Sequence, residues 1–400
     1  MNTNAIPAPA RTLTALGIGQ ILAWGATYYL PAVLAQPIAR DTGWPLTWIV
    51  AALSLGTLVS GLVAPFVGRR IDHIGGRPVL VASALLIAAG LCGLALAPNL
   101  AAYLACWFVL GLGMAAGLYD AAFGTLGRLY GQDARQRITV LTLFGGFAST
   151  VCWPLSAWLV ASVGWRGTCL AYAGLHLFVV APMYLLLLPR QTVAETAQAA
   201  APTARAAASL GVKRLQFLLL AASGALTAAI GAIVAVHLLA LLQQRGVSLA
   251  AAVALGALIG PAQVGARVIE MLLGRFHHPL WTMAVAALLM FAGTAMLYSD
   301  TVVVGVALVL YGAGMGIHSI ARGTVPLALF GPDRYATVMG RLARPGAIVG
   351  AIAPTLVAML WAASSDAAVL ASLLLGTTLN LLVVGVLVLD WRRAATVESA

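Results

Sequence analysis

The sequence predicts an all-α membrane protein in which twelve transmembrane helices form two pseudo-symmetric six-helix bundles. Three observations predict this fold. Of the 400 residues, 62% are hydrophobic and only 8% are charged, and the mean hydropathy is +0.99, whereas a soluble domain carries roughly a quarter of charged residues. The apolar residues fall into twelve long stretches, and residues that mark the first half of the chain recur in the second half.

Each apolar stretch is long enough to cross a bilayer, because about 20 helical residues span a hydrocarbon core of about 30 Å. An even number of spans places both termini on the same side. In the first half the stretches lie at 13 to 39, 46 to 68, 78 to 97, 100 to 127, 137 to 162 and 167 to 188, and in the second half at 214 to 241, 248 to 273, 279 to 298, 301 to 324, 337 to 363 and 367 to 390.

An internal repeat relates the two halves. Asp and Pro are scarce in this chain, so their recurrence at a constant spacing carries more weight than the recurrence of Gly. Doubled helix bundles of this kind are typical of secondary transporters. We expect an N-terminal bundle at 1–188, a cytoplasmic linker at 189–213 and a C-terminal bundle at 214–400. The repeated residues are Gly131, Asp133, Gly146 and Pro154, which recur as Gly331, Asp333, Gly346 and Pro354, and the Gly-x-Gly-Met of 111–114, which recurs at 312–315.

The distribution of basic residues predicts the orientation, since Lys and Arg are retained on the cytoplasmic side. Most of the 22 basic residues fall in segments that share a side with the N-terminus, while the opposite loops keep only Arg40, Arg166 and Arg245. We therefore expect cytoplasmic N- and C-termini in a bacterial inner membrane. Spread over many loops, these charges predict no nucleic-acid partner.

The remaining composition argues against an enzyme or a metalloprotein. The acidic residues are scattered, no phosphate-binding loop of the Walker type is present, and the loops are short. Cys92, Cys106, Cys152 and Cys169 lie in predicted spans without paired spacing. We expect these four cysteines to be buried single thiols, and a site for a soft metal or a metalloid is the alternative. We expect no cofactor and no metal site, and a monomer in the lipid bilayer.

A charged, Gly-rich turn follows the second stretch, where residues 68–78 read GRRIDHIGGRP. Gly permits a tight turn, while Asp72 and Arg77 are suited to pair with a neighbouring helix end. The turn resembles the loop signature of the major facilitator superfamily, which Gly68, Asp72, Gly75 and Arg77 match. The resemblance implies the major facilitator fold and a gating loop made of these four residues, in which Asp72 and Arg77 hold the two halves together on the cytoplasmic side. A loop that only sets the topology is the alternative.

Four short segments resemble one branch of this superfamily, the monocarboxylate and oxalate/formate porters. Two positions depart from related patterns: Ala32 stands where some monocarboxylate carriers have a lysine, and Trp107 where drug/proton antiporters have an arginine. The matching segments are Tyr-Tyr-Leu-Pro at 28–31, Thr-Trp-Ile at 47–49, Gly-Trp-Arg-Gly at 164–167 and Gly-Ala-Arg at 265–267.

Arg267 is the leading candidate for substrate binding. An ionisable group at bilayer depth costs at least about 3 kcal/mol, so it needs a partner or a task. The resemblance implies that Arg267 binds a substrate carboxylate, which a guanidinium grips with two hydrogen bonds. Gln263 lies one turn earlier on the same face. An ion pair between Arg267 and Glu270 is the alternative, and Glu270 is also a candidate for proton coupling.

Other ionisable residues fall inside predicted spans. A lone buried carboxylate at Asp120 would be protonated part of the time, as a proton-coupled carrier requires, although pairing with Arg128 is equally open. His318 and Arg322 share one helix face and would extend a cationic surface. In the alternative reading, Arg322 reaches the inner interface.

Three aromatic residues of the first stretch, Trp24, Tyr28 and Tyr29, are expected to form walls of the cavity, with anchoring at the membrane interface as the alternative. Together the sequence predicts a secondary active transporter that moves a small organic anion, preferably a carboxylate, by alternating access, with protons as the expected coupling ion. An efflux transporter for a drug-like or toxic compound, including a metalloid, is the alternative.

Overall fold

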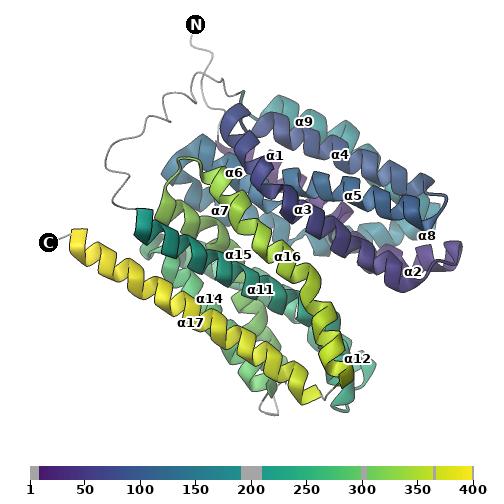
Figure 1. Cartoon of the computed structure of the whole chain (residues 1–400). Helices are drawn as coiled ribbons and strands as arrows, with labels where there is room; N and C mark the ends of the chain where they lie inside the picture. Colours follow the sequence, from purple (N-terminus) through teal and green to yellow (C-terminus); the bar gives the residue numbers. More distant parts are fainter. Residues whose placement is uncertain (1–8, 191–209, 299–303, 364–365, 399–400) are drawn as a thin grey trace, which may run out of the picture. The chain divides into compact units, whose positions relative to one another are not determined.

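The computed structural model describes residues 9–190, 210–298, 304–363 and 366–398, and every regular element in these ranges is helical (Figure 1). The predicted all-α class is confirmed. The expected linker at 189–213 falls almost wholly outside the described residues. The helices are α1 (Pro9–Ala26), α2 (Leu30–Thr42), α3 (Leu46–Ile74), α4 (Gly76–Leu96), α5 (Leu100–Gly117), α6 (Tyr119–Tyr130), η1 (Gly131–Asp133), α7 (Ala134–Gly146), α8 (Ala148–Leu175), η2 (His176–Val180), α9 (Ala181–Leu187), α11 (Leu210–Gln244), α12 (Leu249–Gly256), α13 (Ile259–Leu273), η4 (Gly274–Phe276), α14 (Pro279–Tyr298), α15 (Val304–Phe330), α16 (Tyr335–Ala363) and α17 (Asp366–Glu398).

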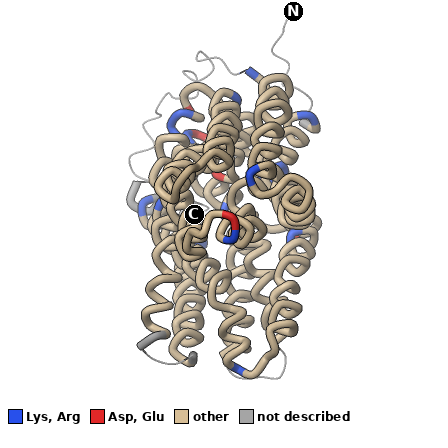
Figure 2. Tube along the Cα trace, turned by 90° about the vertical axis from the view of Figure 1, so that its right-hand side faces the viewer, with Lys and Arg blue, Asp and Glu red and all other residues tan. Residues whose placement is uncertain are grey.

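Ten segments of the described chain are long and apolar enough to cross a membrane. One of them, Leu100–Leu187, contains 88 residues. At 1.5 Å per residue a single helix of that length would measure about 130 Å, several times the thickness of a bilayer. The segment in fact contains α5 to α9, with α8 itself kinked at Gly164 (φ +70°), and it holds three of the predicted spans. Charged residues are few along the described part of the trace (Figure 2).

The described residues divide into two compact units. The first contains 9–190 and 331–344, and the second contains 210–298, 304–330, 345–363 and 366–398. Residues 331–344, which follow α15 in the second half of the sequence, thus pack with the first unit. Within the second unit α17 packs against both α11 and α14 (Figure 1). The expected bundle boundaries remain a prediction.

The repeated glycines allow equivalent helix contacts in the two units. In the first, a Cβ on Gly111 of α5 would lie 2.6 Å from the Gly56 carbonyl oxygen of α3, and one on Gly113 would lie 2.7 Å from the Ile87 side chain of α4. In the second unit a Cβ on Gly312 of α15 would meet α13, and one on Gly314 would meet α14, the nearest backbone oxygens lying 2.8 and 2.7 Å away. Both α5 and α15 therefore approach two neighbouring helices closely through Gly-x-Gly.

Several predicted spans are interrupted helices. The first span breaks between α1 and α2, where the Tyr29 amide bonds to the Trp24 carbonyl at 3.0 Å and Pro31 opens the new helix. Proline lacks the N–H that would continue the α1 ladder, so it favours a break here. The fourth span breaks at Leu118, whose backbone is extended, and the fifth breaks at Phe147.

The second unit is interrupted differently. The eighth predicted span is divided into α12 and α13 by residues 257–258. In the eleventh predicted span, α16 runs through both Pro345 and Pro354 without a break. Proline is tolerated within a membrane helix when neighbouring groups take up the freed carbonyls. The His237 ring, 3.0 Å from the Pro354 carbonyl oxygen, is one contact at this helix.

Candidate functional site

An aromatic cluster lies at the break between α1 and α2 in the first unit. The Trp24 ring centroid is 5.4 Å from that of Tyr28, 6.0 Å from that of Tyr29 and 5.2 Å from that of Tyr119 on α6. Tyr28 is 37% exposed. The three aromatic residues expected from the first span are therefore brought together, and Tyr119 joins them from the second helix break.

The two breaks are joined by Gln20, a fully buried side chain that the sequence reading did not single out. Its amide nitrogen donates to the Gly117 carbonyl oxygen at 2.6 Å, and its amide oxygen accepts from the Trp24 indole N–H at 3.1 Å. Gly117 is the last residue of α5, where the interrupted ladder leaves carbonyls without helical donors. Gln20 satisfies one of them and orients Trp24 in the cluster.

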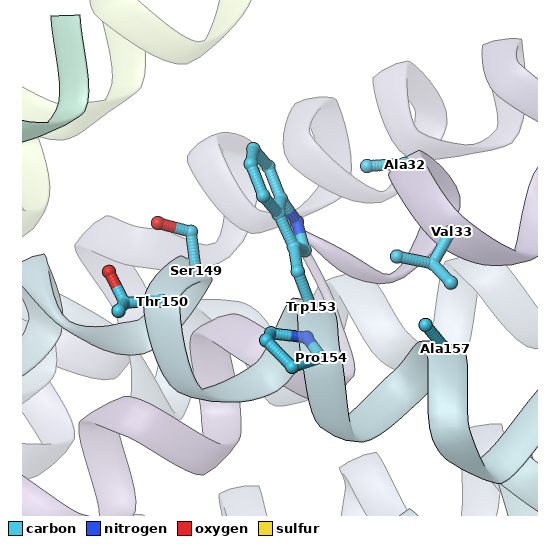
Figure 3. Close-up of a pocket in the computed structure, with 7 residues that line it drawn as sticks. All are labelled: Ala32, Val33, Ser149, Thr150, Trp153, Pro154 and Ala157. Atoms are coloured by element: carbon cyan, nitrogen blue, oxygen red, sulfur yellow. The ribbon is translucent and has the colours of Figure 1, made fainter. Parts of the chain in front are cut away.

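A pocket of about 510 Å³ lies beside the cluster, between α2 and the start of α8. Figure 3 shows the indole of Trp153 standing between the hydroxyls of α8 on one side and the α2 side chains on the other. The Trp153 ring centroid is 6.0 Å from that of Tyr29, so the pocket and the cluster are continuous. The lining residues are Ala32, Val33, Ser149, Thr150, Trp153, Pro154 and Ala157.

Asp120 lies in the first turn of α6, just after the break at Leu118, and is partly buried. A carboxylate in this position is favoured by the partial positive charge of the helix N-terminus. Arg128, which the sequence offered as an ion-pair partner, donates a hydrogen bond to the main-chain carbonyl of Asp72.

In the second unit, Arg267 lies on α13 and is only 6% exposed. Its Nε donates to the Ser319 hydroxyl at 3.0 Å and to the Gly316 carbonyl oxygen at 3.2 Å, both on α15. A terminal guanidinium nitrogen lies 3.4 Å from the Gln263 side-chain oxygen. These bonds orient the guanidinium, and they bring Arg267 and Gln263 together as the sequence predicted.

The approach of α13 to α15 depends on Gly316. A Cβ at this position would lie 2.5 Å from the carbonyl oxygen of Gln263 and 2.7 Å from its Cα. Both are backbone atoms, which do not move aside as a flexible side chain does. The glycine therefore permits the spacing at which Arg267 reaches α15.

Glu270 has partners of its own. Its carboxylate accepts from the Thr282 hydroxyl at 2.6 Å, and its other oxygen lies 3.6 Å from the His277 Nε2. Arg267, by comparison, forms hydrogen bonds to α15 and to Gln263. His318 is 7% exposed on α15, immediately before Ser319, and Arg322 follows one turn later. The second unit thus places two basic residues on the helix that holds the Arg267 side chain.

The expected gating loop is largely helical: Gly68 and Asp72 lie in the last turns of α3, Arg77 lies in the first turn of α4, and only Gly75 lies between the two helices. Gly75 adopts φ +84°, a conformation that favours glycine. Asp72 accepts hydrogen bonds from the amide and the hydroxyl of Thr337, while a Cβ on Gly68 would collide with the Ala336 carbonyl oxygen. Arg77 has no hydrogen bond or ion pair in the part of the chain that the structure describes.

Sequence reasoning missed Gln20, Trp153 and Thr337, and it missed the hydroxyls of Ser149 and Thr150. A polar Gln within an apolar span was a usable signal, because such residues need a partner in the membrane. Pro154 of the internal repeat lines the pocket, although the repeat predicted no pocket. Nothing in the sequence connects Thr337 with Asp72.

Comparison with known proteins identifies related families and folds. A family model described as Major Facilitator Superfamily matches residues 16–354. The structure is similar to that of the human organic anion transporter MFSD10 (TETRAN), with a TM-score of 0.73 and 19% identity, covering 94% of this chain and 100% of that chain. It is also similar to the E. coli fucose:proton symporter FucP, with a TM-score of 0.71 and 15% identity, covering 94% and 98%. At such identities the likeness shows the fold alone.

Two curated relatives match part of the chain. An uncharacterized 38 kDa protein in a 23S RNA operon of Thermoproteus tenax is 34% identical over 172 residues, which is 42% of this chain and 44% of the relative. The transcription regulatory protein OpdE of Pseudomonas aeruginosa is 26% identical over 159 residues, 39% of each. The matches thus span less than half the length of either relative.

Proposed function

Because the chain belongs to the major facilitator superfamily, whose members are membrane transporters and not enzymes, we propose that it moves a small organic anion, a carboxylate, by alternating access. The observation that carries this proposal is Arg267. A buried guanidinium in an apolar helix bundle is costly unless it serves a purpose. Its planar head is well suited to hold a carboxylate with two hydrogen bonds.

The neighbours of Arg267 support an anion site in the second unit. Gln263 and Ser319 orient the guanidinium, so a ligand meets a group already held in place. His318 and Arg322 add basic side chains on α15, and we assign them supporting roles in anion binding. In the first unit we assign substrate contacts to Trp24, Tyr28 and Tyr29, because the three rings offer apolar area and the two tyrosines offer hydroxyls.

Proton coupling and gating complete the proposal. Asp120 is the proposed coupling carboxylate in the first unit and Glu270 in the second, because each is an acidic group within a predicted span. Gly68, Asp72, Gly75 and Arg77 are the proposed gating loop. We place the protein in a bacterial inner membrane as a monomer, with cytoplasmic termini, on the basis of its basic loops.

Binding to the purified protein tests the proposal. The thermal shift is measured with small carboxylates, inorganic anions, hydrophobic drugs and arsenite, for the wild type, Arg267→Ala and Arg275→Ala. Arg275 is an exposed cation in η4, the short helix that follows α13, and serves as the control. We expect a carboxylate to stabilise the wild type and the control but not Arg267→Ala. Stabilisation by drugs or arsenite alone, unchanged in Arg267→Ala, would instead establish the efflux alternative.

A further inference from the structure

The hydroxyls of Ser149 and Thr150 lie in the pocket without a hydrogen-bond partner among the described residues. A Ser or Thr within a helix usually donates to a carbonyl three or four residues earlier. Thr27 does so in this protein, bonding to the Ala23 carbonyl oxygen at 2.6 Å. Ser149 and Thr150 instead begin α8 just after the break at Phe147 and are available to a ligand or to water.

The depth of the pocket argues that it faces an aqueous cavity. The α2 helix has 13 residues, so the α1/α2 break lies about 20 Å from its far end, well inside a hydrocarbon core of about 30 Å. At such depth, irregular backbone occurs only where it is buried in protein or lines a water-filled cavity. Open hydroxyls in lipid would be equally unfavourable.

The pocket offers a ring surface and no charge. Trp153 is 45% exposed although it packs against Tyr29, so one part of its indole is covered and another part is free. None of the seven lining residues is ionisable, and Ala32 is among them. The pocket therefore suits an uncharged part of a substrate. Its volume of about 510 Å³ falls within the usual range for small-molecule sites, about 300–1,000 Å³, and is far larger than a two-carbon acid requires.

Resting on the proposed function, we infer that the transported anion is an aromatic carboxylate, whose ring stacks on Trp153 in the pocket between α2 and α8. Aromatic rings favour offset or edge-to-face contacts with one another, and the exposed part of Trp153 provides such a surface. The hydroxyls of Ser149 and Thr150 add hydrogen-bonding groups at the pocket edge. A carboxylate without a ring leaves this surface uncovered.

Calorimetric titration of the purified full-length protein tests the inference, with phenylacetate and acetate as ligands. We expect phenylacetate to bind at least tenfold more tightly than acetate. Trp153→Ala should weaken phenylacetate binding about tenfold while acetate binding stays the same, and Trp153→Phe should retain most of the affinity. Trp158→Ala is the matched control, since Trp158 lies on the same helix, is 64% exposed and does not line the pocket.

The outcomes separate this inference from the proposed function. Suppose that both acids bind with the same affinity, and that this affinity falls in Arg267→Ala but not in Trp153→Ala. The aromatic class is then overturned while the anion transporter stands. Suppose instead that phenylacetate and the neutral benzyl alcohol bind with the same affinity, and that this affinity falls in Trp153→Ala but not in Arg267→Ala. The anion proposal then fails, and with it the carboxylate class. Loss of phenylacetate binding in Trp158→Ala as well as in Trp153→Ala would overturn the assignment to this pocket.

Discussion

Asp72 at the end of α3 caps the beginning of α16 through Thr337, a residue 265 positions away. The carboxylate accepts from the Thr337 amide at 2.8 Å and from its hydroxyl at 2.5 Å. The first amides of a helix have no partner within the helix, and its N-terminus favours a negative charge. An acidic residue of the proposed gating loop thereby caps a helix from the second half of the sequence.

Asp72→Ala should loosen the start of α16. Hydrogen bonds to a charged group contribute about 1.5–3 kcal/mol, so we expect amide exchange in residues 335–344 to speed up at least tenfold, measured by hydrogen–deuterium exchange. Asp133→Ala is the control, because that residue uses its main-chain carbonyl, not its carboxylate, to accept from Arg137. Unchanged exchange in Asp72→Ala would mean that the cap does not hold this segment.

Gly316→Ala should separate α13 from α15. The added Cβ would meet the backbone of Gln263, and overpacking of this kind typically costs about 1–3 kcal/mol. We expect a lower melting temperature and weaker carboxylate binding, since Arg267 would lose its place against α15. Gly265→Ala is the matched control on α13, because a Cβ there meets nothing within 4 Å. Equal effects of the two variants would argue against close packing as the cause.

Gln20→Met should destabilise the first unit. The variant keeps the length of the side chain but leaves the Gly117 carbonyl oxygen without its donor, and an unsatisfied buried polar group costs about 1–3 kcal/mol. Thermal unfolding in detergent measures the loss. The same substitution at Gln136, an exposed residue of α7, should leave the unfolding temperature unchanged. An unchanged unfolding temperature in Gln20→Met would show that another group donates to the Gly117 carbonyl oxygen.

Asp120→Asn tests the proposed coupling. The amide keeps the size of the side chain but does not take up or release a proton at neutral pH. In proteoliposomes we expect accumulation driven by a pH gradient to be abolished, while exchange of labelled for unlabelled substrate persists because it needs no net proton movement. Accumulation at the wild-type level would remove Asp120 from the coupling path and leave Glu270 as the proposed group.

The helix class and the recurrence of the glycines were predictable from the chain, whereas the close packing at those glycines was found only in the structure. The apolar stretches predicted the helices because a bilayer leaves a backbone few other ways to satisfy its polar groups. Arg267 and Gln263 were predictable as neighbours because they lie one helical turn apart. The break at α1/α2 was less predictable: Pro31 was visible, but its effect depends on how Tyr29 and the surrounding helices pack.

The sequence by itself determined that this is an all-α membrane protein with repeated halves, because hydrophobicity and periodic glycine positions are local properties of the chain. Only the tertiary structure decided which polar groups meet. The Asp72 cap on α16 and the Gln20 bridge to Gly117 both depend on contacts between separate helices. Such contacts are set by the packing of whole helices, and no spacing within one helix encodes them.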